Sequence, residues 1–212
     1  MKLLRFLKKP FYNQSYYNNK ISFLLIFTFI NIFINAFAII LLDSNEIEPE
    51  NIIEKLSIIE QFFLIGILFP IIEELVFRYP LKLNTKNIDA IFLLTIPISI
   101  ILFFSSNLLL LGILTLTSIL LYAFFRKKIQ DYLIKNSANV IIFYGLALLF
   151  SLCHIDNYSS DPTYIVIIFI ILAFISGVLF SVVRMLIGFK YAVWSHIIYN
   201  CFFITLNFLY PI

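Results

Sequence analysis

Three ionisable side chains stand close together at the end of an apolar run in this 212-residue chain: Glu73, Glu74 and Arg78. Glu74 and Arg78 are four residues apart, so on a helix they share a face and can form an ion pair that offsets part of the cost of burial. Glu73 lies about 100° away around the helix axis and lacks that local partner, which suits it to act as a general base. The alternatives are a purely structural Glu–Arg cluster and a Glu73 paired with another helix.

The chain has two histidines, and both lie in or at the end of apolar stretches: His154 and His196. Imidazole can act as an acid, a base or a metal ligand near neutral pH. Asn200 follows His196 by four residues, so the two side chains project from one helical face and can donate hydrogen bonds to a common oxygen. Phe150 stands in the same relation to His154, where its ring can form one wall of a site. For either histidine alone, hydrogen-bonded packing is the alternative.

The composition places these residues in a membrane. Apolar residues make up 62% of the chain, charged residues 13%, and the mean hydropathy is +1.00, whereas soluble domains are about 45–50% apolar and 25% charged. Since a domain of this size still exposes about 30% of its unfolded surface, a core cannot hide all the apolar side chains. We therefore expect an all-α, polytopic integral membrane helix bundle of about seven transmembrane helices.

The same counts exclude other classes of protein. The five glycines form no phosphate-binding loop, and the two cysteines fit neither a disulfide framework nor a thiolate metal cage. The net charge of +3 comes mostly from basic residues between apolar stretches, a pattern typical of membrane topology. We therefore expect the lipid bilayer as a partner and no nucleic acid.

Seven apolar stretches approach or reach membrane-spanning length. They are Ile21 to Leu42, Ser57 to about Leu81, Ile88 to Phe104, Leu108 to Phe125, Asn139 to about His154, Thr163 to Val183, and Phe189 to Tyr210. Of the 15 basic residues, 13 flank these stretches on one side. The positive-inside rule then predicts a multi-pass cell-membrane protein with a cytoplasmic N-terminus and an external C-terminus.

The depth of His154 needs a particular start for the fifth helix. His154 lies 19 residues after Lys135, so a straight helix that began at Lys135 would place it across the membrane from Glu73 and His196. We expect the fifth helix to begin in the cytoplasm instead, with residues 130–139 as its exposed first turns. The alternatives are a broken or tilted helix and a site in a deep aqueous cavity.

Three short motifs have the right order and spacing for a known family. Glu73 to Arg78 reads EExxxR, Phe150 to His154 reads FxxxH, and His196 to Asn200 reads HxxxN. Together they resemble the signature motifs of the CPBP family of intramembrane proteases, which includes the type II CAAX prenyl endopeptidases and the related Abi proteins. The resemblance covers residues 60–210, with two apolar stretches between the first two motifs where the family commonly has a shorter connection.

The resemblance implies a role for each motif residue. Glu73 and His154 would activate the attacking water, His196 and Asn200 would stabilise the oxyanion, and Glu74 and Arg78 would hold the site together. Two mechanisms stay open. The site is either metal-free, or it holds a divalent metal such as zinc on Glu73, His154 and His196, which satisfy the three-ligand pattern of catalytic zinc.

The resemblance also implies a division of the chain and a function. Residues 1–56 form a basic N-terminal segment, a first transmembrane helix and an acidic loop, and residues 57–212 form the protease-like domain. The expected function is that of an intramembrane endopeptidase acting on a membrane-associated peptide or protein. The alternatives are a non-catalytic bacteriocin-immunity or scaffold membrane protein and a proton-coupled transporter.

Overall fold

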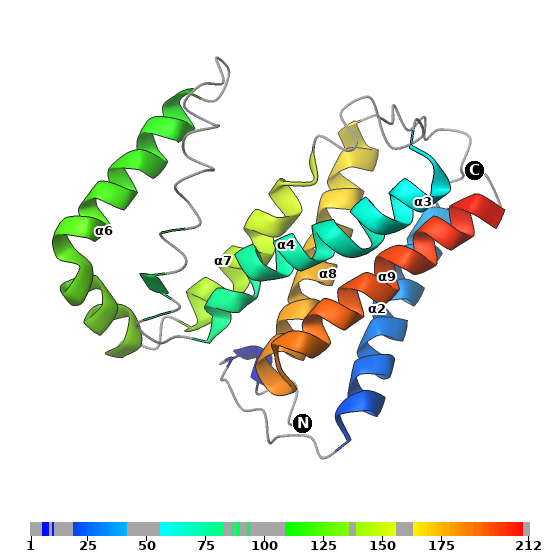
Figure 1. Ribbon diagram of the computed structural model, residues 1–212, viewed down its shortest axis with the longest axis horizontal. Helices are drawn as coiled ribbons and strands as arrows, with labels where there is room; N and C mark the ends of the chain where they lie inside the picture. The colour runs from blue at the N-terminus through cyan, green and yellow to red at the C-terminus, as the bar shows by residue number, and fades with distance from the viewer. Residues whose placement is uncertain are drawn as a thin grey trace.

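The computed structural model describes residues 6–8, 10, 19–41, 56–82, 86, 88–89, 93, 109–135, 139–155 and 163–209, and every regular element among them is helical (Figure 1). The elements are α2 (Lys20–Leu41), α3 (Ile58–Gln61), η3 (Phe62–Leu68), α4 (Phe69–Phe77), η4 (Tyr79–Leu81), α6 (Leu109–Lys135), α7 (Asn139–Leu152), α8 (Thr163–Leu186) and α9 (Phe189–Leu209). The predicted all-α class is therefore confirmed for this part of the chain.

Three of these helices are long and apolar enough to cross a membrane: Lys20–Ile40 of α2, α8 and α9. Apolar side chains on them face outward, among them Phe29, Phe33 and Phe37, which stack along one face of α2. Such a surface is stable in lipid and costly in water. The chain is thus a membrane protein by its helices as well as by its composition.

Six of the seven predicted stretches coincide with described helices. The first is α2, the second runs through α3, η3, α4 and η4, the fourth is the first part of α6, and the last three are α7, α8 and α9. The third stretch, 88–104, and the acidic loop expected before Ser57 lie mostly or wholly outside the described residues. The number of spans therefore stays a prediction.

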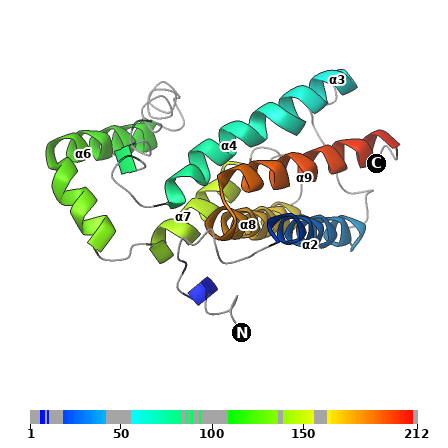
Figure 2. The same ribbon diagram turned by 60° about the horizontal axis from the view of Figure 1, so that its bottom comes forward.

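Helix α9 lies at the centre of the bundle. It packs against η3 and α4 on one side and against α8 and α2 on the other (Figure 2). Helix α7 packs along α8 and also meets α4. In both views α6 stands to one side of these helices (Figures 1 and 2).

A close approach brings α7 and α8 together. At Gly177 of α8, an added Cβ would lie 3.2 Å from the Ala147 carbonyl oxygen and 3.2 Å from Cδ1 of Phe150. Small residues allow this kind of contact between helices in a membrane. Gly177 thereby lets α7 hold Phe150 against the interior of the bundle.

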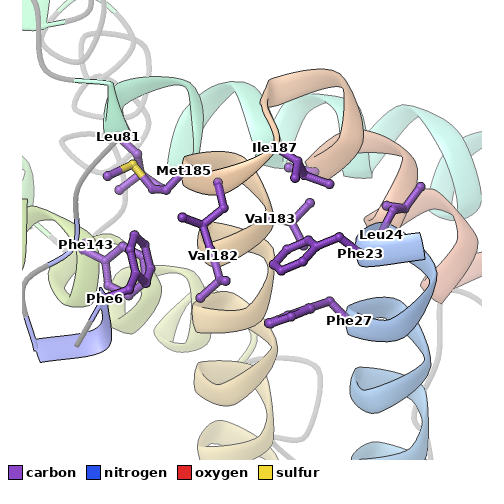
Figure 3. Packing of buried hydrophobic residues seen from close by; sticks show 12 residues of the cluster. Phe6, Phe23, Leu24, Phe27, Leu81, Phe143, Val182, Val183, Met185 and Ile187 are labelled. Atoms are coloured by element: carbon purple, nitrogen blue, oxygen red, sulfur yellow. The ribbon is translucent and has the colours of Figure 1, made fainter. Parts of the chain in front are cut away.

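A cluster of buried apolar side chains closes one end of the bundle (Figure 3). Phe6, from the N-terminal segment, packs edge-on against Phe143 of α7, with ring centroids 5.9 Å apart. Phe23 and Phe27 of α2 stack at 4.3 Å against the other side of α8. The cluster therefore joins α2, α7, η4 and the end of α8.

Polar side chains inside the bundle tie α2 to its neighbours. The hydroxyl groups of Thr28 and Ser195 lie 2.6 Å apart, which links α2 to α9. Ser176 of α8 donates to Oδ1 of Asn31 at 2.8 Å. Hydrogen bonds of this kind hold helices together where the surrounding lipid offers no partner. The helix that lies outside the region of family resemblance is therefore fastened directly beside His196.

The turn between α8 and α9 requires a glycine. Gly188 has φ 120°, a region that side chains rarely adopt, and its N–H donates to the Val183 carbonyl oxygen at 3.2 Å. The turn is buried and leads directly into Phe189, the first residue of α9. Its backbone conformation thus sets how α9 leaves α8.

We expect Gly188→Ala to lower the melting temperature of the detergent-solubilised protein by roughly 2–10 °C, because the strained backbone costs about 1–3 kcal/mol. Gly145→Ala on α7 is the matched control, since an added Cβ there meets open space. Alanine favours a helix interior by about 1 kcal/mol over glycine, so the control should be neutral or stabilising. A fall with Gly145→Ala as large as that with Gly188→Ala would contradict the prediction.

Candidate active site

The three motifs fall on three helices that meet in the bundle. Glu73 and Glu74 lie on α4, and Arg78 is its C-terminal cap. His154 lies in the turn after α7, and His196 and Asn200 lie on α9. Helix α4 contacts both α7 and α9.

The predicted ion pair between Glu74 and Arg78 is present. Nε of Arg78 lies 3.4 Å from Oε1 of Glu74, and both side chains are 0% exposed. The Arg78 guanidinium also lies 4.0 Å from the centre of the Phe150 ring, with the rings of Phe77 and Phe180 at 5.7 and 5.6 Å. Aromatic faces attract a cation, so Arg78 is held by one carboxylate and three rings.

Arg184 of α8 donates hydrogen bonds to the backbone at the C-terminal end of α4. Its Nε donates to the Arg78 carbonyl oxygen at 3.0 Å, and its Nη2 donates to that of Tyr79 at 3.4 Å. A cation at a helix C-terminus satisfies carbonyl groups that lack a helical partner. Arg184 directly follows the predicted sixth stretch, Thr163 to Val183, and is one of the 13 basic residues expected to flank the apolar stretches, but its side chain is buried.

His196 lies between the two glutamates. Its Nδ1 is 3.1 Å from Oε1 of Glu74, and its Nε2 is 3.4 Å from Oε2 of Glu73. The contact between Nδ1 and Glu74 is a hydrogen bond, and the contact between Nε2 and Glu73 is within ion-pair distance. The ring of Phe180 stacks on that of His196 at 4.4 Å. The imidazole of α9 therefore bridges two neighbouring carboxylates of α4.

The two glutamates differ in burial. Glu74 is fully buried, whereas Glu73 is 27% exposed. The imidazole that contacts Glu73 is that of His196, so Glu73 does pair with another helix, one of the alternatives left open by the sequence. Part of the Glu73 side chain is therefore not covered by the rest of the described protein.

Phe150 brings the two histidines together. Its ring centroid lies 4.5 Å from that of His154 and 5.9 Å from that of His196. Nδ1 of His154 lies 2.7 Å from the Phe150 carbonyl oxygen. Because a carbonyl oxygen only accepts hydrogen bonds, we assign the proton to Nδ1, which leaves Nε2 of the neutral ring as a base. The wall that the four-residue spacing predicted is thus in place.

The short length of α7 explains how His154 comes to lie beside Phe150. The sequence predicted that residues 130–139 form the first turns of the fifth helix, and this is wrong for the residues up to Lys135, because these belong to α6. That helix bends at Phe125 (φ −112°, ψ 21°) and continues to Lys135. Helix α7 begins only at Asn139 and has 14 residues, or about 21 Å, less than the roughly 30 Å of a bilayer core. The turn after it therefore meets side chains from within longer helices.

Asn200 bonds to the backbone of another helix. Its Nδ2 donates to the Ile65 carbonyl oxygen in η3 at 2.8 Å. The spacing from His196 predicted an amide that shares an oxygen with that histidine, and one of its two N–H groups is already used elsewhere. The sequence feature related to this contact is Pro70, in the same apolar run as Ile65, because proline has no backbone N–H to offer a preceding carbonyl group.

A zinc site on the three predicted ligands does not fit the side chains as they stand. Among the described residues, no three His, Cys, Asp or Glu side chains are grouped so that they can hold a metal ion. Both nitrogens of His196 also face carboxylate oxygens. The zinc implied by the family resemblance stays a prediction, and no step below uses a metal.

Comparisons of the chain with protein-family models, with curated proteins and with solved structures give no match. The family resemblance therefore rests on the three sequence motifs.

Proposed function

We propose that the chain is an intramembrane endopeptidase of the CPBP type, which hydrolyses a peptide bond in a membrane-associated substrate with a water activated by Glu73. The observation that supports this proposal most is the contact of His196 with Glu73, together with the Phe150 ring that lies against both histidines, in helices whose outer faces are apolar. A base, a second base and hydrogen-bond donors are what peptide hydrolysis requires of its site. The proposal includes seven spans, a cytoplasmic N-terminus and an external C-terminus.

The proposed reaction begins with a water molecule between the Glu73 carboxylate and Nε2 of His154. Glu73 takes a proton from the water as its oxygen attacks the carbonyl carbon of the substrate. The negative charge that develops on the carbonyl oxygen is stabilised by N–H groups of His196 and Asn200. The proton then passes to the leaving nitrogen, and the C–N bond breaks to give a carboxylic acid and an amine.

A non-catalytic membrane protein is the second candidate. The observation that favours it is that His196 and Asn200 already have partners within the protein, in Glu73, Glu74 and the Ile65 carbonyl group. In that case the same side chains form a buried polar network that fixes the helices. The two functions differ in whether a basic nitrogen at position 154 is needed.

His154→Gln tests the proposal in proteoliposomes with a panel of quenched fluorogenic peptides, each attached to an acyl chain. Glutamine can still donate to the Phe150 carbonyl oxygen but has no basic nitrogen, so we expect cleavage to fall at least 100-fold while the melting temperature is unchanged. Asn207→Gln, at an exposed position on α9, is the control and should cleave normally.

If His154→Gln still cleaves the peptides that the wild-type protein cleaves, the proposed role of His154 is contradicted. Absence of cleavage of every anchored peptide by the wild-type protein would favour the non-catalytic candidate.

A further inference from the structure

The helix before the glutamates changes its hydrogen-bond register. Residues Phe62–Leu68 form a π-helix between α3 and α4, and the Phe69 N–H donates to the Leu64 carbonyl oxygen, five residues back. Short π-helical stretches inside α-helices occur frequently at functional sites. This one ends at Leu68, five residues before Glu73.

Pro70 lies just after the change of register, where its missing N–H affects the carbonyl groups of the preceding turn. In the five-residue register that Phe69 establishes, the Ile65 carbonyl oxygen would accept from residue 70. In the four-residue register of an α-helix, the Gly66 carbonyl oxygen would do so. Proline has no backbone N–H, so the one donor that residue 70 would supply, to Ile65 in the first register or to Gly66 in the second, is missing. An unpaired backbone group is strongly unfavourable inside a membrane.

Two consecutive side chains of α9 meet these two consecutive carbonyl groups. Nδ2 of Asn200 donates to the Ile65 oxygen at 2.8 Å, and Sγ of Cys201 lies 3.8 Å from the Gly66 oxygen. Gly66 permits this approach, because a Cβ at that position would lie 3.0 Å from Sγ of Cys201. The neighbouring helix thus supplies a side-chain donor in place of the N–H that residue 70 lacks.

The contact fixes the orientation of the Asn200 amide. A carbonyl oxygen accepts only from the nitrogen, so Nδ2 must face Ile65 and Oδ1 must point away from it. The amide nitrogen has two N–H groups, and one of them is used by this contact. The second N–H belongs to the same rigid plane as the first.

We propose that Pro70 is a positioning residue for Asn200: because Pro70, in α4, has no backbone N–H to offer the Ile65 carbonyl oxygen of η3, that oxygen binds one N–H of Asn200, which aims the second at the oxyanion formed beside His196. This inference rests on the proposed function for the role of the second N–H. The effect of Pro70 on the hydrogen bond between Asn200 and the Ile65 carbonyl group does not depend on the proposed function.

A double-mutant cycle of Pro70→Ala and Asn200→Leu tests the inference by melting temperature in detergent and by kcat and KM for an acyl-anchored fluorogenic peptide. Alanine gives residue 70 an N–H, and leucine has nearly the shape of asparagine without a donor. Asn200→Leu should lower the melting temperature of the wild-type protein by roughly 2–10 °C, and that of Pro70→Ala by less than half as much. Pro80→Ala, in η4, is the control and should leave the full effect of Asn200→Leu.

The kinetic arm separates positioning from a general change in the helix. Pro70→Ala should lower kcat about 10-fold or more with KM within about 2-fold, and the double variant should be no slower than Asn200→Leu alone. Additive losses in kcat would overturn the inference, because Pro70 would then act by another route, such as a displaced Glu73. An equal fall in melting temperature with Asn200→Leu in both backgrounds would also overturn it. If even the wild-type protein cleaves no peptide, the proposed function fails, while the melting-temperature cycle still decides whether Pro70 holds Asn200.

Discussion

Glu73→Gln is expected to reduce peptide hydrolysis by about 10²–10⁴-fold, the usual contribution of a general base. Glutamine keeps the size of the side chain and can still accept a hydrogen bond from His196, but its amide cannot take a proton from water. Because Glu73 is partly exposed, the change should leave the melting temperature within about 2 °C of the wild-type value. Cleavage of the acyl-anchored peptides in proteoliposomes measures the loss.

Glu60→Gln is the matched control for this prediction. Glu60 also lies on the helical segment that leads to Glu73, but it is exposed and its Oε2 accepts the Ser57 backbone N–H at 2.8 Å in a capping box. Glutamine serves at the same position of a capping box, so we expect normal cleavage. A Glu73→Gln protein that keeps more than a tenth of the wild-type rate would show that another group activates the water.

Arg78→Met is expected to lower the melting temperature by roughly 6–20 °C. The change removes the arginine partner of the fully buried Glu74 carboxylate and leaves it only the contact with His196. Removal of one partner from a buried pair costs about 3–5 kcal/mol. Methionine retains contact with the rings of Phe77, Phe150 and Phe180. Thermal unfolding of the detergent-solubilised protein measures the effect.

Two further variants make this prediction specific to the buried pair. Combining Arg78→Met with Glu74→Gln removes the unpaired charge and should recover most of the lost stability. Arg126→Met breaks the ion pair with Asp89, where the Arg126 side chain is 61% exposed, and should cost less than about 1 kcal/mol. A double variant as unstable as Arg78→Met alone would mean that the lost aromatic contacts, and not the unpaired charge, cause the instability.

Local helical geometry made several features readable from the sequence. The four-residue spacings placed Glu74 against Arg78 and Phe150 against His154, because residues four apart on a helix always share a face. The composition likewise required lipid around the chain, and three described helices have the length and apolarity to cross it. The predicted end of the fourth stretch at Phe125 coincides with the bend of α6, where basic residues replace apolar ones.

Contacts between helices were decided by the tertiary structure. The sequence alone determined which residue types are present and which of them share a helical face. It did not determine that Glu73 meets His196 rather than another group, or that Asn200 bonds to the Ile65 carbonyl oxygen. Nor did it determine that Arg184 turns inward to the end of α4. These contacts depend on how far each helix is shifted along its neighbour, and that shift is set by the short α7, the π-helical register before Pro70 and the turn at Gly188. A spacing of three or four residues repeats within one helix, but no such periodicity fixes the offset between two.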